Sequence, residues 1–358
     1  MMLDIKITQR KDLKPKPDDE SKLGFGRIFT DHMFIMNYTE SRGWHDARIV
    51  PYGPFVLDPS CMVFHYAQEM FEGLKAYRAA DGSILLFRPQ KNFERMNKTN
   101  RRICIPEVNL NDALQAVVEL VRLERDWVPR AEGTSLYIRP FIFATDPQLG
   151  VHPSKTYIFA IILSPVGSYY AAGINPIRIF VETEYVRSVR GGTGFAKVGG
   201  NYAASLIAQA EAERLGYAQV LWLDGIEHKY IDEVGSMNVF FVIGGEIITP
   251  SLDEGNILPG ITRASCIELL RSWGYTVTER RLALSEVIEA YKNGRLNEAF
   301  GTGTAAVISP IGELDSGDDK LVINNNKIGP IAQKLYDSLT GIQWGRIEGP
   351  EGWVVKVC

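Results

Sequence analysis

The chain has 358 residues, more than a single hydrophobic core usually supports, so we expect two domains. Hydrophobic residues make up 45% and charged residues 23% of it, as in an ordinary globular protein. The formal net charge of -4 argues against nucleic acid as the main partner, because phosphate backbones require a concentrated basic surface. Small anionic ligands need only local positive charge and stay open.

Cysteine, histidine and apolar patterns exclude further classes of protein. The four cysteines are widely separated and form no CxxC pair, which favours reduced thiols and a cytoplasmic protein over a disulfide framework. The five histidines show no HxH or HxxxH spacing, so we expect no metal site. The N-terminus lacks the apolar core of a signal peptide, and the longest apolar runs, at 158–163 and 239–243, are too short to span a membrane.

The predicted elements follow one another in a mixed α+β order. Residues 1–30, with prolines and a run of charges, are typical of a mobile arm. We expect strands at 33–38, 83–87, 134–143 and 156–163, and a helix at 111–127 capped by Asn109 or Asn111. After a small-residue stretch at 164–173 we expect strands at 177–183, 219–223, 238–243 and 247–249, and helices at 203–215, 262–273, 285–292 and 329–339. We therefore place a first domain at 31–164, an interdomain loop at 165–175 and a second domain at 176–358.

Five glycines surround Lys197 in the segment 190–202, RGGTGFAKVGGNY. Glycines let the backbone pass close to a bulky ligand. The spacing excludes a phosphate-gripping P-loop, because Ala196 and Val198 stand where Gly and Ser or Thr are needed. A flexible surface loop is the alternative, but such a loop seldom continues directly into an alanine-rich helix that carries Asn201 and Tyr202. A lysine with a lowered pKa is a suitable imine-forming nucleophile.

Two adjacent carboxylates, Asp232 and Glu233, stand between apolar runs at 220–223 and 239–243. A carboxylate flanked by buried strands is unfavourable unless it is paired. Both could be ordinary turn residues. Alternatively, one of them could hold the protonated pyridine nitrogen of pyridoxal phosphate and keep that ring an electron sink.

Three further features could bind phosphate. The segments 258–263 (LPGITR) and 301–306 (GTGTAA) present Gly and Thr beside turns, where backbone N–H groups are exposed to anions. A simple helix N-terminus is the alternative interpretation of the first segment. The second also matches a dinucleotide fingerprint, but Pro310 interrupts the helix that this motif requires. Arg95 could clamp a phosphate with its guanidinium, although a single helical arginine more often faces solvent.

Taken together, these segments resemble the branched-chain amino acid aminotransferases of the fold-type IV pyridoxal-phosphate enzymes. The resemblance extends over nearly the whole chain after about residue 24, and its motifs lie at 25–33, 66–75, 137–140, 150–151, 164–167, 197–202, 233–238, 258–263 and 301–305. It implies an α+β fold of two domains, with mixed sheets, flanking helices and pyridoxal 5'-phosphate bound between the domains. It also implies a homodimer in which each subunit completes the other's pocket.

The resemblance implies roles for individual residues. Lys197 would be the Schiff-base lysine and proton shuttle, Glu233 would bind the pyridine nitrogen, and Tyr202 the ring hydroxyl. The phosphate would be held by Arg95, Thr262, Thr304 and, through its backbone, Ile261. The substrate site would be formed by Phe25, Phe71, Tyr137, Tyr169, Ser236, Thr304 and Ala305, with Tyr66, Leu149 and Val151 from a second subunit. Strand alternation puts Arg139 on the same face as Tyr137, which makes Arg139 the candidate partner for a glutamate carboxylate.

The implied reaction is reversible transfer of the amino group of L-leucine, L-isoleucine or L-valine to 2-oxoglutarate in a ping-pong cycle. Two positions depart from the family pattern: Ser236 stands where threonine is common, and Ala306 and Ser309 replace a redox CxxC, so no thiol switch is expected there. The nearest alternative is a D-amino acid aminotransferase or an aminodeoxychorismate lyase of the same fold, which the aromatic segments and Tyr137-x-Arg139 disfavour. A nucleotide-binding dehydrogenase would rest on 301–306 alone, and a cofactor-free binding module would show no visible absorption band.

Overall fold

The computed structural model describes residues 3–167 and 174–358, which divide into two compact units. Unit 1 contains the described residues 3–167, 197–199 and 341–358, and unit 2 contains residues 174–196 and 200–340. Two segments from the second half of the sequence therefore belong to unit 1. One of them is only three residues long, and it carries Lys197.

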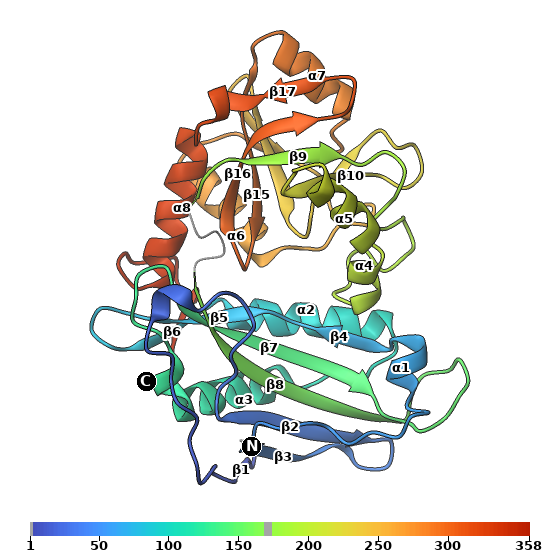
Figure 1. Cartoon of the computed structure of the whole chain (residues 1–358), viewed down its shortest axis with the longest axis vertical. Coiled ribbons are helices and arrows are strands. Elements are labelled where there is room, and N and C mark those ends of the chain that lie inside the picture. Colours follow the sequence, from blue (N-terminus) through green and yellow to red (C-terminus); the bar gives the residue numbers. More distant parts are fainter. Residues whose placement is uncertain (1–2, 168–173) are drawn as a thin grey trace. The chain divides into compact units, whose positions relative to one another are not determined.

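Unit 1 is built on a sheet of nine described strands in the order β1-β3-β2-β8-β7-β5-β6-β18, with β4 paired to β7 (Figure 1). The pairing of β1 with β3 is parallel and the others are antiparallel. The two long apolar strands predicted from the sequence are confirmed as neighbours, β7 and β8, which pair from Ser135–Val166 to Ala144–Tyr157. The strands are β1 (Lys6–Ile7), β2 (His32–Thr39), β3 (Gly43–Pro51), β4 (Glu69–Phe71), β5 (Leu74–Arg78), β6 (Ile84–Phe87), β7 (Ser135–Ala144), β8 (Thr156–Val166) and β18 (Val354–Lys356).

Three helices accompany this sheet: α1 (Met62–Tyr66), α2 (Pro89–Arg102) and α3 (Leu110–Leu123). Helices α2 and α3 contact each other, and their apolar faces join the sheet in one core. The cap of α3 is confirmed as Asn109, whose side-chain oxygen accepts from the N–H groups of Asn111 and Asp112 at 2.9 and 3.3 Å. The helix ends before the expected residue 127, because the chain tightens into a 3₁₀ turn at Arg125–Trp127.

The N-terminal arm differs from the mobile segment that its composition suggests. Strand β1 pairs with β3, and the N–H of Arg10 donates to the ring of His32 at 2.8 Å. Further along, the N–H of Lys14 donates to the carboxylate of Asp31 at 2.7 Å. Charged composition does not reveal such backbone contacts, which are what fix the arm to unit 1.

Unit 2 contains a mixed sheet in the order β11-β10-β9-β16-β15-β12-β13-β14, with β17 paired to β16 (Figure 1). Strand β9 is parallel to β10 and β16, and β13 is parallel to β14, while the remaining pairs are antiparallel. The predicted α+β class with mixed sheets is thus confirmed. The strands are β9 (Ile177–Val181), β10 (Gln219–Leu223), β11 (Ile231–Val234), β12 (Asn238–Ile243), β13 (Glu246–Thr249), β14 (Val277–Glu279), β15 (Leu296–Gly303), β16 (Val307–Asp315) and β17 (Lys320–Val322).

The predicted helices of the second half are all present, with shifted ends. They are α4 (Gly199–Ala203), α5 (Leu206–Arg214), α6 (Ile261–Ser272), α7 (Leu284–Lys292) and α8 (Pro330–Gln343). The segment 301–306, in contrast, is followed by no helix: β15 turns directly into β16. A dinucleotide fingerprint requires a helix after its glycines, so the hairpin confirms that this match was accidental.

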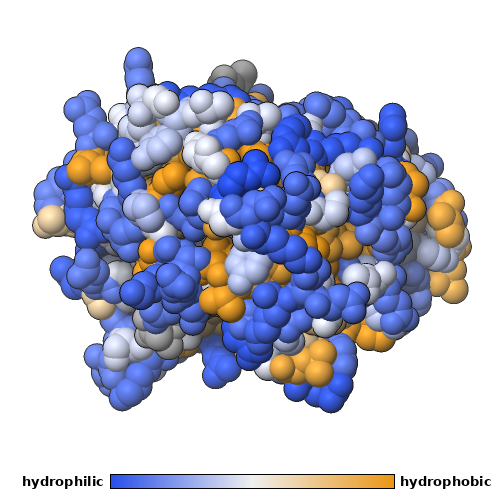
Figure 2. Space-filling view, turned by 90° about the horizontal axis from the view of Figure 1, so that it is seen from above, coloured by the Kyte–Doolittle hydropathy of each residue, from blue (hydrophilic) through white to orange (hydrophobic). Residues whose placement is uncertain are grey.

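The surface carries no sign of a membrane span within residues 3–167 and 174–358. Figure 2 shows a face on which hydrophilic residues predominate and hydrophobic residues form separate groups. No described helix is both long and apolar enough to cross a membrane. The described residues also contain no group of three His, Cys, Asp or Glu side chains that could hold a metal ion.

Candidate active site

Lys197 lies in the short segment that unit 1 holds by backbone hydrogen bonds. Its N–H donates to the hydroxyl of Thr99 at 3.0 Å, and its carbonyl accepts from the N–H of Phe71 at 3.1 Å. The N–H of Gly199 donates to Glu69 at 2.5 Å, and a Cβ on Gly199 would lie 2.1 Å from that carboxylate. Since Thr99 belongs to α2 and Phe71 to β4, elements distant in sequence fix the lysine backbone.

The surroundings of the Lys197 amine favour its neutral form. Its Nζ lies 4.6 Å from the centroid of the Phe71 ring. Burial lowers the pKa of Lys197 to about 8; the charge of Arg95 acts in the same direction, and Glu72 opposes it. Near neutral pH a much larger fraction of this amine is therefore unprotonated than in an ordinary lysine. An unprotonated amine is what nucleophilic or proton-accepting chemistry requires.

Arg95 is oriented by a buried carboxylate that the sequence did not single out. Glu72 is fully buried and accepts from Nε and Nη2 of Arg95, both at 2.8 Å. The amide of Asn92 donates to the same carboxylate at 2.8 Å. Burial alone would raise the pKa of Glu72, but the charge of Arg95 outweighs it and holds that pKa below its usual value. The two-point contact fixes the plane of the guanidinium, a group suited to phosphate.

Aromatic rings and one arginine gather around Tyr137 in β7. The ring of Phe25 packs edge-on against it, with centroids 4.9 Å apart. Arg139 donates to the Tyr137 hydroxyl at 3.0 Å, and its guanidinium lies 4.7 Å from the centroid of Phe71. Gly73 is required here, because a Cβ would lie 2.2 Å from that hydroxyl. The predicted common face of Tyr137 and Arg139 is confirmed, and Nε of Arg139 is buried without a hydrogen-bond partner among the described residues.

The residues assigned to a second subunit lie together on the surface of unit 1. Tyr66 ends α1, and its hydroxyl accepts from the N–H of Gly150 at 2.8 Å. On either side of this glycine, Leu149 and Val151 are 64% and 87% exposed. Gly150 has a φ of +145°, which residues with a Cβ rarely adopt. Tyr169, the remaining residue assigned to the pocket, lies outside the described residues.

In unit 2 the glycine-rich loop is fixed by Asn201, which the sequence suggested only as polar punctuation. The amide nitrogen of Asn201 donates to the carbonyls of Thr193 and Ala196, both at 2.8 Å. Its amide oxygen accepts from the Thr193 hydroxyl at 2.7 Å. One side chain thereby sets the backbone that leads into position 197, and Tyr202 follows it directly in α4.

Glu233 and Tyr202 line one cavity of unit 2, with an empty volume of about 340 Å³. Ser236 lines the same cavity. The Glu233 carboxylate accepts from the N–H of Leu258 at 2.8 Å and lies 3.4 Å from Nη2 of Arg187. These contacts keep a buried carboxylate at the wall of a cavity large enough for part of a ring-shaped ligand.

The expected phosphate-binding residues meet at one end of the unit 2 sheet. Helix α6 begins at Ile261, and no described side chain caps its N-terminus at Gly260. Asn238 connects this helix to the 301–306 hairpin, because its amide donates to the carbonyl of Leu258 at 2.9 Å and its backbone pairs with Thr302. A Cβ on Gly260 would lie 1.9 Å from the Asn238 side chain. An uncapped helix N-terminus therefore lies near a threonine-bearing turn, an arrangement suited to an anion.

Comparison with known proteins agrees with these features. The model of the amino-transferase class IV family matches residues 69–314. Branched-chain-amino-acid aminotransferase 2 of Bacillus subtilis (strain 168) is 59% identical over 354 residues, which cover 99% of this chain and 96% of that protein. The chain belongs to the branched-chain aminotransferases of class IV. It is therefore a transaminase, and the cofactor of this class is pyridoxal 5'-phosphate.

Solved structures of branched-chain aminotransferases share the fold. The enzyme of Thermoproteus uzoniensis, solved with norvaline, is 27% identical, has a TM-score of 0.76 and covers 91% of this chain and 100% of its own. The T.th. enzyme, complexed with N-(5'-phosphopyridoxyl)-L-glutamate, is 27% identical, has a TM-score of 0.72 and covers 90% of this chain and 98% of its own. The fold-type IV assignment made from sequence motifs is confirmed.

Several residues that position the site in this branched-chain aminotransferase were absent from the sequence prediction. Glu72 orients Arg95, Thr99 holds the backbone of Lys197, and Asn238 joins the two phosphate segments. A carboxylate flanked by Phe and Gly in an apolar stretch was a usable signal for Glu72, because a buried carboxylate needs a partner. Thr99 and Asn238 gave no local signal, since their contacts depend on the tertiary fold.

Proposed function

We propose that this transaminase transfers the amino group of L-leucine, L-isoleucine or L-valine to 2-oxoglutarate, and runs the reaction in both directions. The observation that carries the proposal is the group of Phe25, Phe71 and Tyr137 around one arginine, Arg139, with the Lys197 amine against the same Phe71 ring. Aromatic rings suit a branched aliphatic side chain, and the arginine suits the second carboxylate of glutamate. The 59% identical Bacillus subtilis relative, named for branched-chain amino acids, supports the substrate class.

The residues fit pyridoxal 5'-phosphate by their chemistry. A buried lysine with a lowered pKa suits an aldehyde, a buried carboxylate suits a pyridinium nitrogen, and an uncapped helix N-terminus suits a phosphate. When bound, the cofactor supplies an electron sink for the charge that forms at the substrate α-carbon. In our proposal Lys197 attaches the cofactor, Glu233 faces its pyridine nitrogen and Tyr202 its ring hydroxyl. The phosphate is assigned to Arg95, Thr262, Thr304 and the backbone of Ile261.

Lys197 is also assigned the proton transfer. Its amine takes the α-proton of the amino acid and returns it when the 2-oxo acid is formed, acting as base and then as acid. A pKa of about 8 suits both roles, because neither the neutral nor the protonated form is rare near neutral pH. Arg95 and Glu72 act on this balance in opposite directions. Ping-pong kinetics follow from the single site, which each substrate enters in turn.

A homodimer is the proposed working unit. Leu149 and Val151 are strongly exposed, and the hydroxyl of Tyr66 ties them into one apolar surface. Such a surface is stabilised when a partner covers it, and we propose that a second copy of the chain does so. Light scattering combined with an activity assay tests this: a monomeric variant should be inactive even with cofactor bound. Full activity in a proven monomer would refute the dimer proposal. The four cysteines, all free, support a reducing, cytoplasmic location.

The absorption spectrum of the purified protein is the first experiment. A visible band that shifts on addition of L-leucine and returns with 2-oxoglutarate is expected from the proposed cycle. A D-amino acid aminotransferase would respond to D-alanine instead, and an aminodeoxychorismate lyase to neither amino acid. Absence of a visible band after incubation with pyridoxal 5'-phosphate would refute the proposed function.

A further inference from the structure

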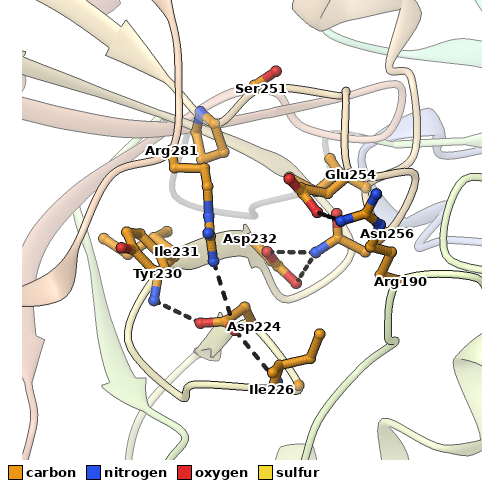
Figure 3. Close-up of a pocket in the computed structure, with 13 residues that line it drawn as sticks. Arg190, Asp224, Ile226, Tyr230, Ile231, Asp232, Ser251, Glu254, Asn256 and Arg281 are labelled. Atoms are coloured by element: carbon orange, nitrogen blue, oxygen red, sulfur yellow. Dashed lines mark hydrogen bonds and ion pairs between the residues drawn. The ribbon is translucent and has the colours of Figure 1, made fainter.

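The two neighbouring carboxylates of β11 face different cavities of unit 2. Successive side chains of a strand point to opposite faces, and here Glu233 lines the cavity that also contains Tyr202. Asp232 lines a second cavity, with an empty volume of about 420 Å³, which we call the rear cavity (Figure 3). Both side chains are buried, at 4% and 3% exposure. The function proposed above uses only Glu233, so the buried charge of Asp232 needs an explanation.

One segment of chain, 256–258, holds both carboxylates. The amide nitrogen of Asn256 donates to the two oxygens of Asp232, each at 2.8 Å (Figure 3). Two residues further on, the N–H of Leu258 donates to Glu233 at 2.8 Å. The anchoring of Asn256 in the rear cavity therefore determines where the Leu258 N–H meets Glu233.

Arg187 forms a second connection between the same groups. Its Nη2 donates to the backbone carbonyl of Asn256 and lies 3.4 Å from the Glu233 carboxylate. The hydroxyl of Ser188 donates to the same carbonyl at 2.6 Å. A displacement of Asn256 would thus change both contacts of Glu233, the Leu258 N–H and the Arg187 guanidinium.

We propose that Asp232 is a positioning residue for Glu233, acting through Asn256 and the segment 256–258 that contacts the catalytic carboxylate. The inference rests on the proposed pairing of Glu233 with the pyridine nitrogen. It assigns Asp232 a place behind the site and no contact with the cofactor.

The other charges of the rear cavity are already committed to their own partners. Arg190 lies 3.3 Å from Glu254, and Arg281 lies 3.0 Å from Glu227. The carboxylate of Asp224 accepts four backbone N–H groups of the loop 226–230, between 2.7 and 3.3 Å. Asp232, in contrast, accepts both of its hydrogen bonds from Asn256 in the part of the chain that the structure describes. Its removal should therefore act on the segment 256–258 rather than on the cavity as a whole.

Protonation of Asp232 should weaken this anchor. Burial raises the pKa of Asp232 to about 7, with Arg187 opposing the shift and Glu233 and Asp224 adding to it. A protonated carboxyl presents one O–H donor, so it can no longer accept at both oxygens from the Asn256 nitrogen. The Asn256 amide oxygen, buried without a partner among the described residues, is the acceptor nearest in sequence and space to that proton. The positioning of Glu233 should consequently change as the pH falls through about 7.

An exchange of the two side chains tests the proposal on the full-length protein. The variants Asp232→Asn, Asn256→Asp and the double exchange are titrated with pyridoxal 5'-phosphate, and the dissociation constant and the pH dependence of the visible band are recorded. Each single variant should bind the cofactor about tenfold more weakly, because one hydrogen-bonded charge is lost or opposed. The double exchange restores a carboxylate–amide pair in the reverse sense and should return to within about threefold of wild type.

A double-mutant cycle with Glu233→Gln separates positioning from a merely structural role. If Asp232 acts through Glu233, then Asp232→Asn should change cofactor affinity much less in the Glu233→Gln background than in wild type. Asp224→Asn is the matched control, since it removes a buried carboxylate of the same cavity that makes no contact with 256–258. It should lower the melting temperature and leave both the cofactor affinity and the pH dependence of the band unchanged.

The outcomes distinguish this inference from the proposed function. If wild type shows no visible band with the cofactor, the proposed function is wrong. If wild type shows the band but Asp232→Asn lowers only the melting temperature, as the Asp224 control does, Asp232 is structural and the inference is overturned. Additive effects in the Glu233→Gln background overturn it equally. Should a single variant fail to fold, the double exchange decides, and a persistent tenfold loss of affinity there counts against the inference.

Discussion

The two units hold their site residues in different ways. In unit 1 the important side chains are oriented by other side chains: Glu72 grips Arg95, and Arg139 lies over Phe71. In unit 2 the backbone does most of this work: the Leu258 N–H holds Glu233, and the N-terminus of α6 offers its own N–H groups. Charge pairs with opposing effects on a pKa thus belong to unit 1, and fixed dipoles belong to unit 2.

This difference indicates a division of labour. The Lys197 amine must change protonation state during the reaction, and its pKa of about 8 results from burial and Arg95 acting against Glu72. Glu233 has the constant task of keeping a ring nitrogen protonated, and preorganised N–H groups suit a charge that does not change. We therefore expect substitutions in unit 1 to alter pH profiles and substrate choice, and substitutions in unit 2 to alter the cofactor itself.

The largest effect is expected from Lys197→Ala. The variant should fold, since the backbone hydrogen bonds of residue 197 stay possible, yet it should lose transaminase activity entirely. Lys75 is a matched control, because burial lowers its pKa to about 8 as well. Borohydride reduction of the wild-type protein followed by peptide mapping should place the cofactor on Lys197. A label on Lys75 would contradict the site assignment.

Glu233→Gln is expected to have the next largest effect. Glutamine keeps the shape of the side chain but removes the charge that holds the pyridine nitrogen protonated, so kcat should fall by a few orders of magnitude. Asp232→Asn should be far milder, because that residue lies in the rear cavity and acts only through the segment 256–258. Single-turnover kinetics of both variants check this, and a reversed order would mean that the wrong carboxylate was chosen.

Glu72→Gln tests whether side-chain pairing is what organises unit 1. Breaking a buried ion pair leaves an uncompensated guanidinium, so unfolding should become easier by about 3–5 kcal/mol and the cofactor should bind more weakly. Glu94→Gln on the same helix breaks only an exposed pair with Lys91 and should change stability by about 1 kcal/mol or less. Denaturant titrations measure both. Equal small effects would show that Arg95 does not depend on Glu72.

Much of unit 2 could be read from the sequence because its signals are local. The strands 219–223 and 238–243 are continuous apolar runs bounded by polar residues, and the structure confirms both boundaries. Strand β15 was missed, because LNEAFGTG mixes polar residues and glycines that disfavour strands. It is stabilised as a strand by its two antiparallel neighbours, β12 and β16.

The candidate site divides along the same line. Lys197, Glu233 and the 258–263 segment stand in motifs whose glycines and polar residues are unusual within a few positions. The contacts that position them join residues far apart in sequence, such as Lys197 with Thr99 and Leu258 with Glu233. No periodicity or spacing encodes such pairs, so sequence indicated the chemistry but not its support.

Arg139→Met sharpens the comparison for substrate choice in unit 1. Methionine keeps an apolar side chain against Phe71 but removes the charge proposed to meet the second carboxylate of 2-oxoglutarate. The KM for 2-oxoglutarate should rise more than about tenfold, as expected for a lost charge-assisted hydrogen bond of ~1.5–3 kcal/mol. The KM for 4-methyl-2-oxopentanoate should change little. If both constants rise together, Arg139 supports the fold around Tyr137 and does not select the substrate.

The smallest expected effect is a change in how the stability of the cofactor-free protein depends on pH. Burial lowers the pKa of Lys197 from 10.5 to about 8, so between these values the folded chain binds fewer protons than the unfolded chain. Stability should therefore rise with pH across this window, by at most about 1.4 kcal/mol per pH unit for one lysine. Lys197→Met should reduce that slope and be more stable than wild type below pH 8, because no charge is then buried. Lys75→Met should do the same on its own account, whereas exposed Lys91→Met should not. Urea unfolding at several pH values measures these slopes, and an unchanged slope in Lys197→Met would mean that the amine is solvated and ordinarily basic, which would remove the physical basis for its proposed work as a base near neutral pH.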